Sequence, residues 1–438
     1  VFYRLYVLYM KKTLVLSCLL FLLGTVSQAQ HLVSYTKVDS FTTDSLHALW
    51  KQNKIKKVIV PIKYDFDVYE VIYKTLYVDG DTITASGYIF LPLMPAKDIA
   101  EGIPASILNH GTEMRINPNW KGLGGMQAVV AAYATDGYYG LYPHYIGLGK
   151  GERRHVYQHT ESEAQASIDM VRALREFAEI METPFNEDLY ISGYSQGGHA
   201  AMASHKIMEE QYPNEFTVRA SAPASGAYHM TGKDQQRRMF EPYGHQAYLP
   251  YLITSMDRAY PEMWDGDIYE VFVPPYDSLL RATMTGEYSI GYVSKRLPEV
   301  PADMLDPALV EQYLQDTAFP LRVALADNDL YDWAPESPML LCYCNSDEQV
   351  DYRNTLFTYD YMKDLGARHV RLSNGGKKYD HNTCALFTSI QTKFFFDSIR
   401  KGKKRGRRGP IFKRFLISLA KLAVKPSDVA VNRKKLKD

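Results

Sequence analysis

The sequence predicts an α/β protein with a mostly parallel central sheet flanked by helices. Between residues 105 and 226, β-rich runs alternate with helical runs, the pattern of parallel strands joined by crossover helices. The same pattern returns between residues 336 and 400. Residues 227–335 lack it and are rich in Tyr and Met, so we expect a mainly helical lid there, called the cap segment below. The core thus has two parts, 30–226 and 336–400, with the cap segment between its sixth and seventh strands.

The N-terminal residues are typical of an export signal. Met10-Lys-Lys is basic, Thr13 to Val26 is apolar, and Ser27-Gln28-Ala29 is a small-x-small cleavage sequence. The apolar run is shorter than the roughly 20 residues of a spanning helix. We therefore expect residues 1–29 to be a signal peptide, with residues 1–9 as an upstream extension. The mature protein is expected to be exported, to a periplasm, an outer surface or the medium.

Positive charge is concentrated at the C-terminus, although the whole chain balances 50 Lys or Arg with 50 Asp or Glu. Residues 401–438 hold 14 Lys or Arg against 2 Asp, so the rest of the chain is net acidic. Within this basic tail, Ile411 to Val424 places its apolar residues on one helical face. The tail could contact an anionic membrane or polymer, and a solvated tail without a partner explains the composition equally well. No motif indicates specific nucleic-acid binding.

The cysteines favour neither a metal site nor a complete set of disulfides. After export the chain would keep Cys342, Cys344 and Cys384, so any one disulfide leaves one thiol over. Cys342 and Cys344 share one face of a predicted strand, which is a poor geometry for a bridge. Their spacing fits no metal site, and we expect neither a metal nor a cofactor.

The first part of the core is expected to begin with a hairpin. The β-rich runs Val68 to Tyr77 and Thr82 to Leu91 flank the turn sequence Val78-Asp79-Gly80-Asp81. A strand over Ala105 to Asn109 and a small-residue helix around Gln127 to Thr135 follow, and then Gly137 to Gly149 is expected to form another strand and a glycine loop. The residues before this hairpin give little signal.

A long crossover helix is predicted next, opening with a capping box at Thr160 and Glu163 and continuing to Met181. The remaining expected elements are a strand at Leu189 to Ser192, a helix at Gln196 to Tyr212, strands at Thr217 to Ser221, Pro338 to Cys344 and His369 to Leu372, and helices through Asn354 to Leu365 and from His381 through Phe396.

Ser195 stands where a strand turns directly into a helix, within Gly193-Tyr194-Ser195-Gln196-Gly197. Side chains at Gly193 and Gly197 would collide with the tightly turned backbone, which explains the glycines. Such a turn exposes the serine hydroxyl at the carboxyl edge of the sheet. It also directs the Gln196 N–H at any oxyanion that forms there. The alternative is a glycine-rich turn whose serine only caps the helix.

Three further candidates follow the ends of other predicted strands. Thr112 comes after a strand that ends in His110-Gly111, where its N–H could serve as a second oxyanion donor. Asp347 and His381 lie on loops late in the chain, so that nucleophile, acid and histidine follow one another in that order. Glu348 competes with Asp347 for the acid role, and we prefer Asp347.

Over residues 65 to 398 the sequence resembles the α/β-hydrolase superfamily, and within it the secretory lipase group of bacterial and fungal esterases with a cap. The resemblance rests on His110-Gly111, Tyr142-Pro143-His144-Tyr145-Ile146-Gly147-Leu148-Gly149, Gly193-Tyr194-Ser195-Gln196-Gly197-Gly198, Asp347-Glu348-Gln349-Val350 and His381. Two positions depart from the pattern. His144 replaces the usual Asp, and Tyr343-Cys344 replaces a common His-Gly pair before the acid.

The resemblance implies a serine hydrolase that cleaves small-molecule or lipid carboxylic esters through a Ser195, His381 and Asp347 triad, without a cofactor. Two other functions are also compatible with the sequence. One is an exported serine peptidase of the same fold, whose amino-terminus site would use carboxylates of the cap segment. The other is a non-catalytic surface protein that binds anionic partners through the basic tail. The carboxylates in question are Glu262, Asp265, Asp267 and Glu270.

Overall fold

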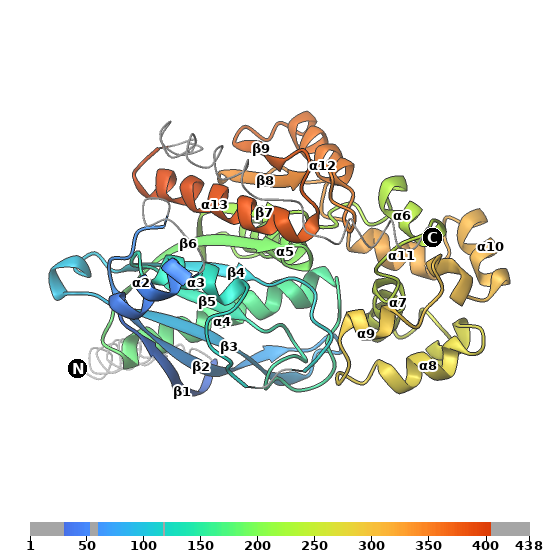
Figure 1. Cartoon of the computed structure of the whole chain (residues 1–438), viewed down its shortest axis with the longest axis horizontal. Coiled ribbons are helices and arrows are strands. Elements are labelled where there is room, and N and C mark those ends of the chain that lie inside the picture. Colours follow the sequence, from blue (N-terminus) through green and yellow to red (C-terminus); the bar gives the residue numbers. More distant parts are fainter. Residues whose placement is uncertain (1–29, 53–59, 117–118, 404–438) are drawn as a thin grey trace, which may run out of the picture. The chain divides into compact units, whose positions relative to one another are not determined.

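The computed structural model describes residues 30–52, 60–116 and 119–403 (Figure 1). The expected signal peptide (1–29) and most of the basic tail (404–438) lie outside these residues. A nine-stranded sheet has the order β1-β2-β3-β5-β4-β6-β7-β8-β9. Its strands are β1 (Leu32–Phe41), β2 (Asp65–Leu76), β3 (Thr82–Leu93), β4 (Ile103–Asn109), β5 (Tyr139–Pro143), β6 (Phe185–Tyr194), β7 (Thr217–Ala224), β8 (Met339–Cys344) and β9 (Val370–Gly376).

The sheet is mostly parallel, as predicted. The neighbouring strands β5, β4, β6, β7, β8 and β9 all pair in parallel, whereas β1, β2 and β3 pair antiparallel. The predicted hairpin is confirmed as β2 and β3, which pair from Leu76 with Thr82 to Asp65 with Leu93. Because parallel strands end at one edge of a sheet, the loops after β4, β6 and β8 come together there.

Helices cover both faces of the sheet because successive strand residues point to opposite sides. In β4, for example, Ile107 packs into one hydrophobic cluster and Leu108 into another. The first cluster includes residues of α4 (Thr160–Ile180), α5 (Gln196–Glu210) and α12 (Tyr352–Asp364). The clusters of the other face include residues of α2 (Thr43–Gln52), α3 (Met126–Ala134) and α13 (His381–Arg400). No helix among the described residues is long and apolar enough to span a membrane.

The cap segment is helical and has its own hydrophobic cluster. It lies between β7 and β8, because β1 precedes the six strands expected before it. Figure 1 shows its helices together at one end of the sheet. They are α6 (Lys233–Phe240), α7 (Tyr248–Ala259), α8 (Tyr276–Thr283), α9 (Ile290–Ser294), α10 (Pro307–Gln315) and α11 (Pro320–Asp327), with short 3-10 turns at Ile268–Val271 and Pro301–Met304.

Two features of the fold differ from the sequence analysis. The N-terminal segment with little signal forms β1 and α2, and β1 is a largely exposed edge strand without a clear alternation of buried residues. Its start is fixed by Glu176, whose carboxylate accepts from His31 N at 2.6 Å and Leu32 N at 3.1 Å. The predicted capping box is wrong, since the N-cap of α4 is His159 and its side chain accepts from Ser162 N.

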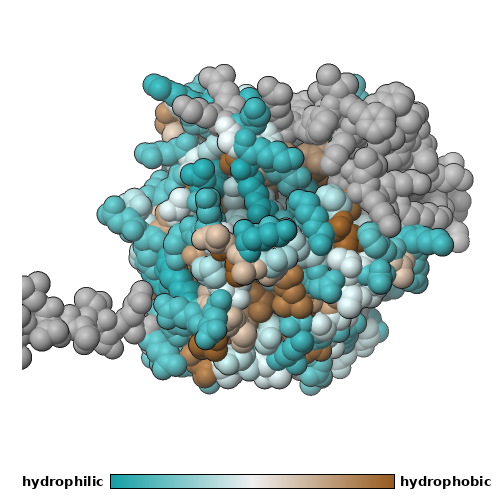
Figure 2. All heavy atoms as spheres, turned by 90° about the vertical axis from the view of Figure 1, so that its left-hand side faces the viewer, coloured by the Kyte–Doolittle hydropathy of each residue, from teal (hydrophilic) through white to brown (hydrophobic). Residues whose placement is uncertain are grey.

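The end of the sheet that faces away from the cap segment is mostly hydrophilic. Figure 2 shows this face, with hydrophilic side chains over most of it and hydrophobic ones gathered near its centre. Exposed apolar side chains of this kind are normal on protein surfaces. We therefore assign no function to this end.

A buried lysine holds α13 against the turn between α3 and β5. Lys393 is 3% exposed, and its Nζ donates to Asp136 at 2.5 Å and also to Asp397. Lys63 approaches the other Asp136 oxygen at 2.5 Å, but its side chain is 54% exposed. Burial raises the pKa of Asp136, and the two lysines lower it by more, so this pKa lies below its ordinary value.

These two lysines give a matched test of burial. Lys393→Met should lower the free energy of unfolding by about 3 kcal/mol, because it removes the buried cation that pairs with the buried Asp136 carboxylate. Lys63→Met should cost less than about 1 kcal/mol, because the Lys63 side chain is half exposed and its interaction is screened by water. The Lys393 contribution should be present above the ordinary aspartate pKa and vanish as acid protonates Asp136. Urea unfolding at several pH values measures both variants, and equal losses at neutral pH would contradict the assignment.

Candidate active site

The strand, turn and helix predicted around Ser195 are all present. β6 ends at Tyr194, α5 begins at Gln196, and Ser195 between them has a φ of 62°. A Cβ on Gly193 would lie 1.9 Å from the Gly197 carbonyl oxygen. One on Gly197 would lie 2.0 Å from the carbonyl oxygen of Asn109 in β4. Only glycine fits at both positions, so the two residues permit the sharp turn that presents Ser195.

The turn leaves backbone donors beside the serine. The N–H of Ser195 itself donates to the Ala224 carbonyl at 3.0 Å. Gln196 is the first residue of α5, so its N–H has no acceptor within the helix. The positive end of the α5 dipole adds to the attraction for a negative charge at this point. The geometry thus matches the role predicted for the Gln196 N–H.

Behind the turn, the Gln196 side chain is held in a fully buried polar cluster. Its Nε2 donates to Glu163 Oε1 at 2.7 Å and lies 2.8 Å from His155 Nε2. The other Glu163 oxygen lies 2.7 Å from His199 Nδ1, and both of these residues are fully buried. This cluster was not predicted, because Glu163 was expected in a capping box. Its signals in the sequence are a carboxylate within a predicted core helix and a histidine close to the serine turn.

Asp347 and His381 form a buried pair at the ends of β8 and β9. His381 Nδ1 lies 2.8 Å from both Asp347 oxygens. Asp347 Oδ1 also accepts from the backbone N–H groups of Gln349 at 3.0 Å and Val350 at 2.9 Å. Glu348 instead accepts from the His381 backbone N–H at 3.0 Å. Asp347 is therefore the carboxylate that orients the imidazole, as preferred over Glu348.

The charge state of His381 depends on this pairing. Burial lowers the pKa of His381, but the attraction of Asp347 and the hydrogen bond to it raise the pKa by more. The net result is a pKa above the ordinary histidine value. The imidazole therefore holds its proton to a higher pH than a free histidine would.

A disulfide joins the two chain segments that carry Asp347 and His381. Cys344 at the end of β8 is bonded to Cys384 in the first turn of α13, three residues before Asp347 and three after His381. Gly375 makes room for the bridge, since a Cβ there would lie 2.6 Å from Cys344 Sγ. Cys342 is buried and is not part of a disulfide. The expectation that one disulfide leaves one thiol over is confirmed.

Ser195 and His381 line the same cavity, a space of about 1530 Å³ that is partly open to solvent. Thr112 lines it too, as its predicted role requires. Many of the other lining residues are polar or charged, among them Glu113, Arg115, Asn119, Lys121, Gln127 and Asn382. This cavity, called the polar cavity below, brings together the nucleophile, the histidine and the second oxyanion candidate predicted from the sequence.

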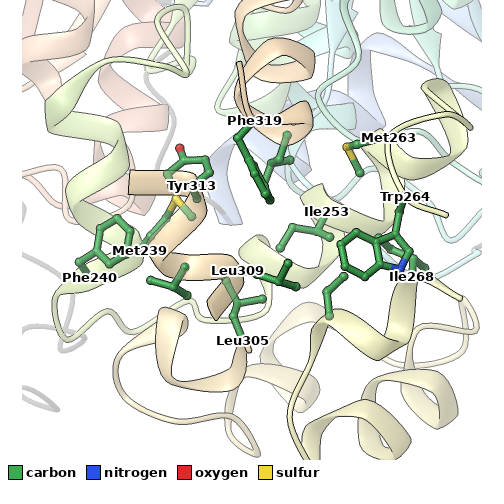
Figure 3. Close-up of a pocket in the computed structure, with 13 residues that line it drawn as sticks. Met239, Phe240, Ile253, Met263, Trp264, Ile268, Leu305, Leu309, Tyr313 and Phe319 are labelled. Carbon is green, nitrogen blue, oxygen red and sulfur yellow. The ribbon is translucent and has the colours of Figure 1, made fainter. Parts of the chain in front are cut away.

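A second cavity of about 750 Å³ lies on the cap side of Ser195 and is mainly apolar. It shares Met239 with a third, strongly apolar pocket of about 550 Å³ inside the cap segment. Figure 3 shows this third pocket, with aromatic and aliphatic side chains pointing into it from several cap helices. The second cavity is called the apolar cavity below. It adjoins Ser195, and the third pocket adjoins it at Met239 within the cap segment.

The residues that depart from the family pattern make defined contacts in the structure. His144 lines the polar cavity, and its Nδ1 lies 3.0 Å from Ser86 Oγ. Burial lowers the pKa of His144 to about 3, so its ring is neutral. Tyr343 stacks on Tyr352 with ring centroids 6.0 Å apart.

The cap carboxylates considered for a peptidase site do not face Ser195. None is among the described residues that line the polar or the apolar cavity. Asp267 instead caps the turn Ile268–Val271 and pairs with Arg281. Nor do the described residues contain a cluster of three His, Cys, Asp or Glu side chains suited to a metal ion.

Sheet order, serine turn and helical cap together define an α/β-hydrolase fold, and solved structures confirm the predicted resemblance. A Legionella pneumophila protein whose hydrolase assignment is provisional matches with a TM-score of 0.77 and 26% identity, over 85% of this chain and 99% of that chain. The rice cell wall degrading esterase LipA from Xanthomonas oryzae matches with a TM-score of 0.70 and 27% identity, over 83% of this chain and 95% of that chain.

Candida antarctica lipase A shares the fold at 15% identity, with a TM-score of 0.64 over 87% of this chain and 84% of that chain. No protein-family model and no curated protein sequence matches the chain. The similarity to esterase and lipase structures supports an ester-cleaving hydrolase.

The raised pKa of His381 predicts a pH dependence of Ser195 reactivity. Labelling of Ser195 by a fluorophosphonate should require neutral His381, so its rate should fall as pH falls, with a midpoint above about 6.5. Asp347→Asn should slow labelling about 10⁴-fold, because the carboxamide holds the imidazole in the wrong tautomer. Glu348→Gln, the adjacent carboxamide change, should retain most of the rate. A midpoint below the ordinary histidine value, or equal effects of the two variants, would contradict this account.

The position of the disulfide predicts that reduction acts on the acid–histidine pair. The bridge closes a chain separation of 40 residues, so its loss should cost about 4 kcal/mol of stability in the chain-entropy model. Dithiothreitol should lower both the urea midpoint and the Ser195 labelling rate of the wild type and of Cys342→Ala. The double variant Cys344→Ala/Cys384→Ala should start low and not respond. A reductant-sensitive double variant would refute the prediction.

Proposed function

We propose that this protein is an exported serine hydrolase that cleaves carboxylic esters through an acyl-enzyme. The observation that carries the proposal is the position of Ser195, which lies at the junction of a polar and an apolar cavity and shares the first with His381. An ester has the same division, with an acyl part on one side of the reacting carbonyl and an alcohol part on the other.

In the proposed mechanism His381 takes the proton of Ser195 Oγ as this oxygen attacks the ester carbonyl. Asp347 keeps the imidazole in the required tautomer through Nδ1 and stabilises the imidazolium. The N–H groups of Gln196 and Thr112 bind the oxyanion, each contributing about 3 kcal/mol to the transition state. His381 then protonates the leaving alcohol, and a water activated by His381 hydrolyses the acyl-enzyme.

The cavities favour an apolar acyl group and a polar alcohol. The acyl chain would enter the apolar cavity and pass Met239 toward the pocket of Figure 3. The alcohol would occupy the polar cavity, where charged and amide side chains can bind hydroxyl groups. LipA is named an esterase and the Candida antarctica protein a lipase, which agrees with this substrate class.

Export is part of the proposal. Disulfides persist mainly in oxidising compartments, so the Cys344–Cys384 bridge supports a location outside the cytosol. The N-terminal sequence typical of a signal peptide supports the same location.

The proposal predicts the outcome of an ester ladder. The mature protein should hydrolyse p-nitrophenyl esters from acetate to palmitate, and Ser195→Ala should lower the rate by about 10⁴-fold or more. A peptide anilide serves as the control substrate. Cleavage of the anilide alone would favour a peptidase. If no substrate is cleaved and a fluorophosphonate leaves Ser195 unlabelled, the catalytic proposal fails, and a binding role of the basic tail becomes the alternative.

A further inference from the structure

The polar and apolar cavities are separated directly beside the candidate nucleophile. Three residues line both cavities: Ser195, Tyr248 and Gln349. Tyr248 is the first residue of α7 in the cap segment, and Gln349 belongs to the core loop that carries Asp347. The Tyr248 hydroxyl donates to Gln349 Oε1 at 2.9 Å. This hydrogen bond therefore joins cap and core at the boundary between the two cavities.

Both partners of this bond are held in place. Gln349 is 5% exposed, its backbone N–H donates to Asp347, and its carbonyl accepts from the Tyr243 hydroxyl at 3.0 Å. The Tyr248 ring stacks on His245 at 5.6 Å and on Tyr157 at 6.2 Å between ring centroids. These contacts hold both residues, so their hydrogen bond forms a fixed boundary between the polar and the apolar cavity.

The position of Tyr248 does not depend on Gln349 alone. Its ring contacts with Tyr157 and His245 do not involve Gln349. The ring can therefore remain beside Ser195 when its bond to Gln349 is broken. Opening this boundary requires the loss of one neutral hydrogen bond, without unfolding of the cap segment.

We infer that the Tyr248–Gln349 hydrogen bond is a chain-length filter for the proposed esterase reaction. A short acyl group reacts at Ser195 while the bond is closed. Tyr248 and Gln349 line the apolar cavity where it meets Ser195, so a long chain that extends from Ser195 into this cavity needs the Gln349 side chain to move aside and reacts only when the bond opens. The inference rests on the proposed function, and it makes Tyr248 and Gln349 specificity residues without a role in the proton transfers.

The test compares kcat/KM for p-nitrophenyl palmitate and p-nitrophenyl acetate in four variants of the full mature chain. Tyr248→Phe and Gln349→Met each remove the bond while keeping a side chain of similar size. Each should raise the palmitate-to-acetate ratio about fivefold, the factor that corresponds to one neutral hydrogen bond. The double variant should give no more than either single change, because both remove the same interaction.

Tyr251→Phe is the matched control. Tyr251 lies on the same helix and also joins cap to core, since its hydroxyl donates to the Glu113 carbonyl at 3.2 Å, but it lines neither cavity. Its ratio should equal that of the wild type. A role of Tyr248 and Gln349 in stability alone would lower both rates equally and leave the ratio unchanged.

The outcomes distinguish a failure of the chain-length filter from a failure of the proposed esterase function. An unchanged ratio in Gln349→Met, with Ser195 still labelled by a fluorophosphonate, would overturn the filter and leave the esterase proposal standing. The same ratio change in Tyr251→Phe would also overturn it. Loss of all ester hydrolysis and labelling in the wild type would instead refute the proposed function. If Tyr248→Phe does not fold, Gln349→Met alone decides the question.

Discussion

Close backbone contact at the serine turn decides how the candidate active site is assembled. The turn between β6 and α5 brings the Gly197 backbone against Gly193 and against the end of β4, leaving no space for a Cβ at either glycine. Ser195 is thereby held in a left-handed conformation at the edge where the parallel strands end. Other parallel strands end at the same edge, where Thr112 follows β4 and Asp347 follows β8.

The loop after β8 connects the acid–histidine pair to the cap segment. Asp347 binds the imidazole of His381, while Gln349, two residues later, binds two tyrosines of the cap segment. The disulfide at Cys344 fixes the start of the same loop to α13. One short segment thus carries the carboxylate that binds His381 and also contacts the cap segment.

Much of the fold followed from local patterns. The β2–β3 hairpin, the crossover helices and the Ser195 turn are encoded by residues adjacent in the chain, and the structure contains each of them. The predictions were incomplete or wrong where a residue's contact partner lies far away in the sequence. The strand β1 is exposed and is fixed by Glu176, and Glu163 binds Gln196 and His199 across two helices instead of closing a capping box.

The α/β class, the order of serine, acid and histidine, and the helical cap could be predicted from the sequence, because these depend on periodicity, glycine sterics and motif order. The folded chain was needed to show which carboxylate contacts His381, which cysteines pair, and which tyrosine of the cap segment lies beside Ser195. These are choices among chemically equivalent neighbours: Asp347 or Glu348, Cys342 or Cys344, Tyr248 or Tyr251. Each is settled by side-chain direction and distance in the folded chain, which sequence spacing does not specify.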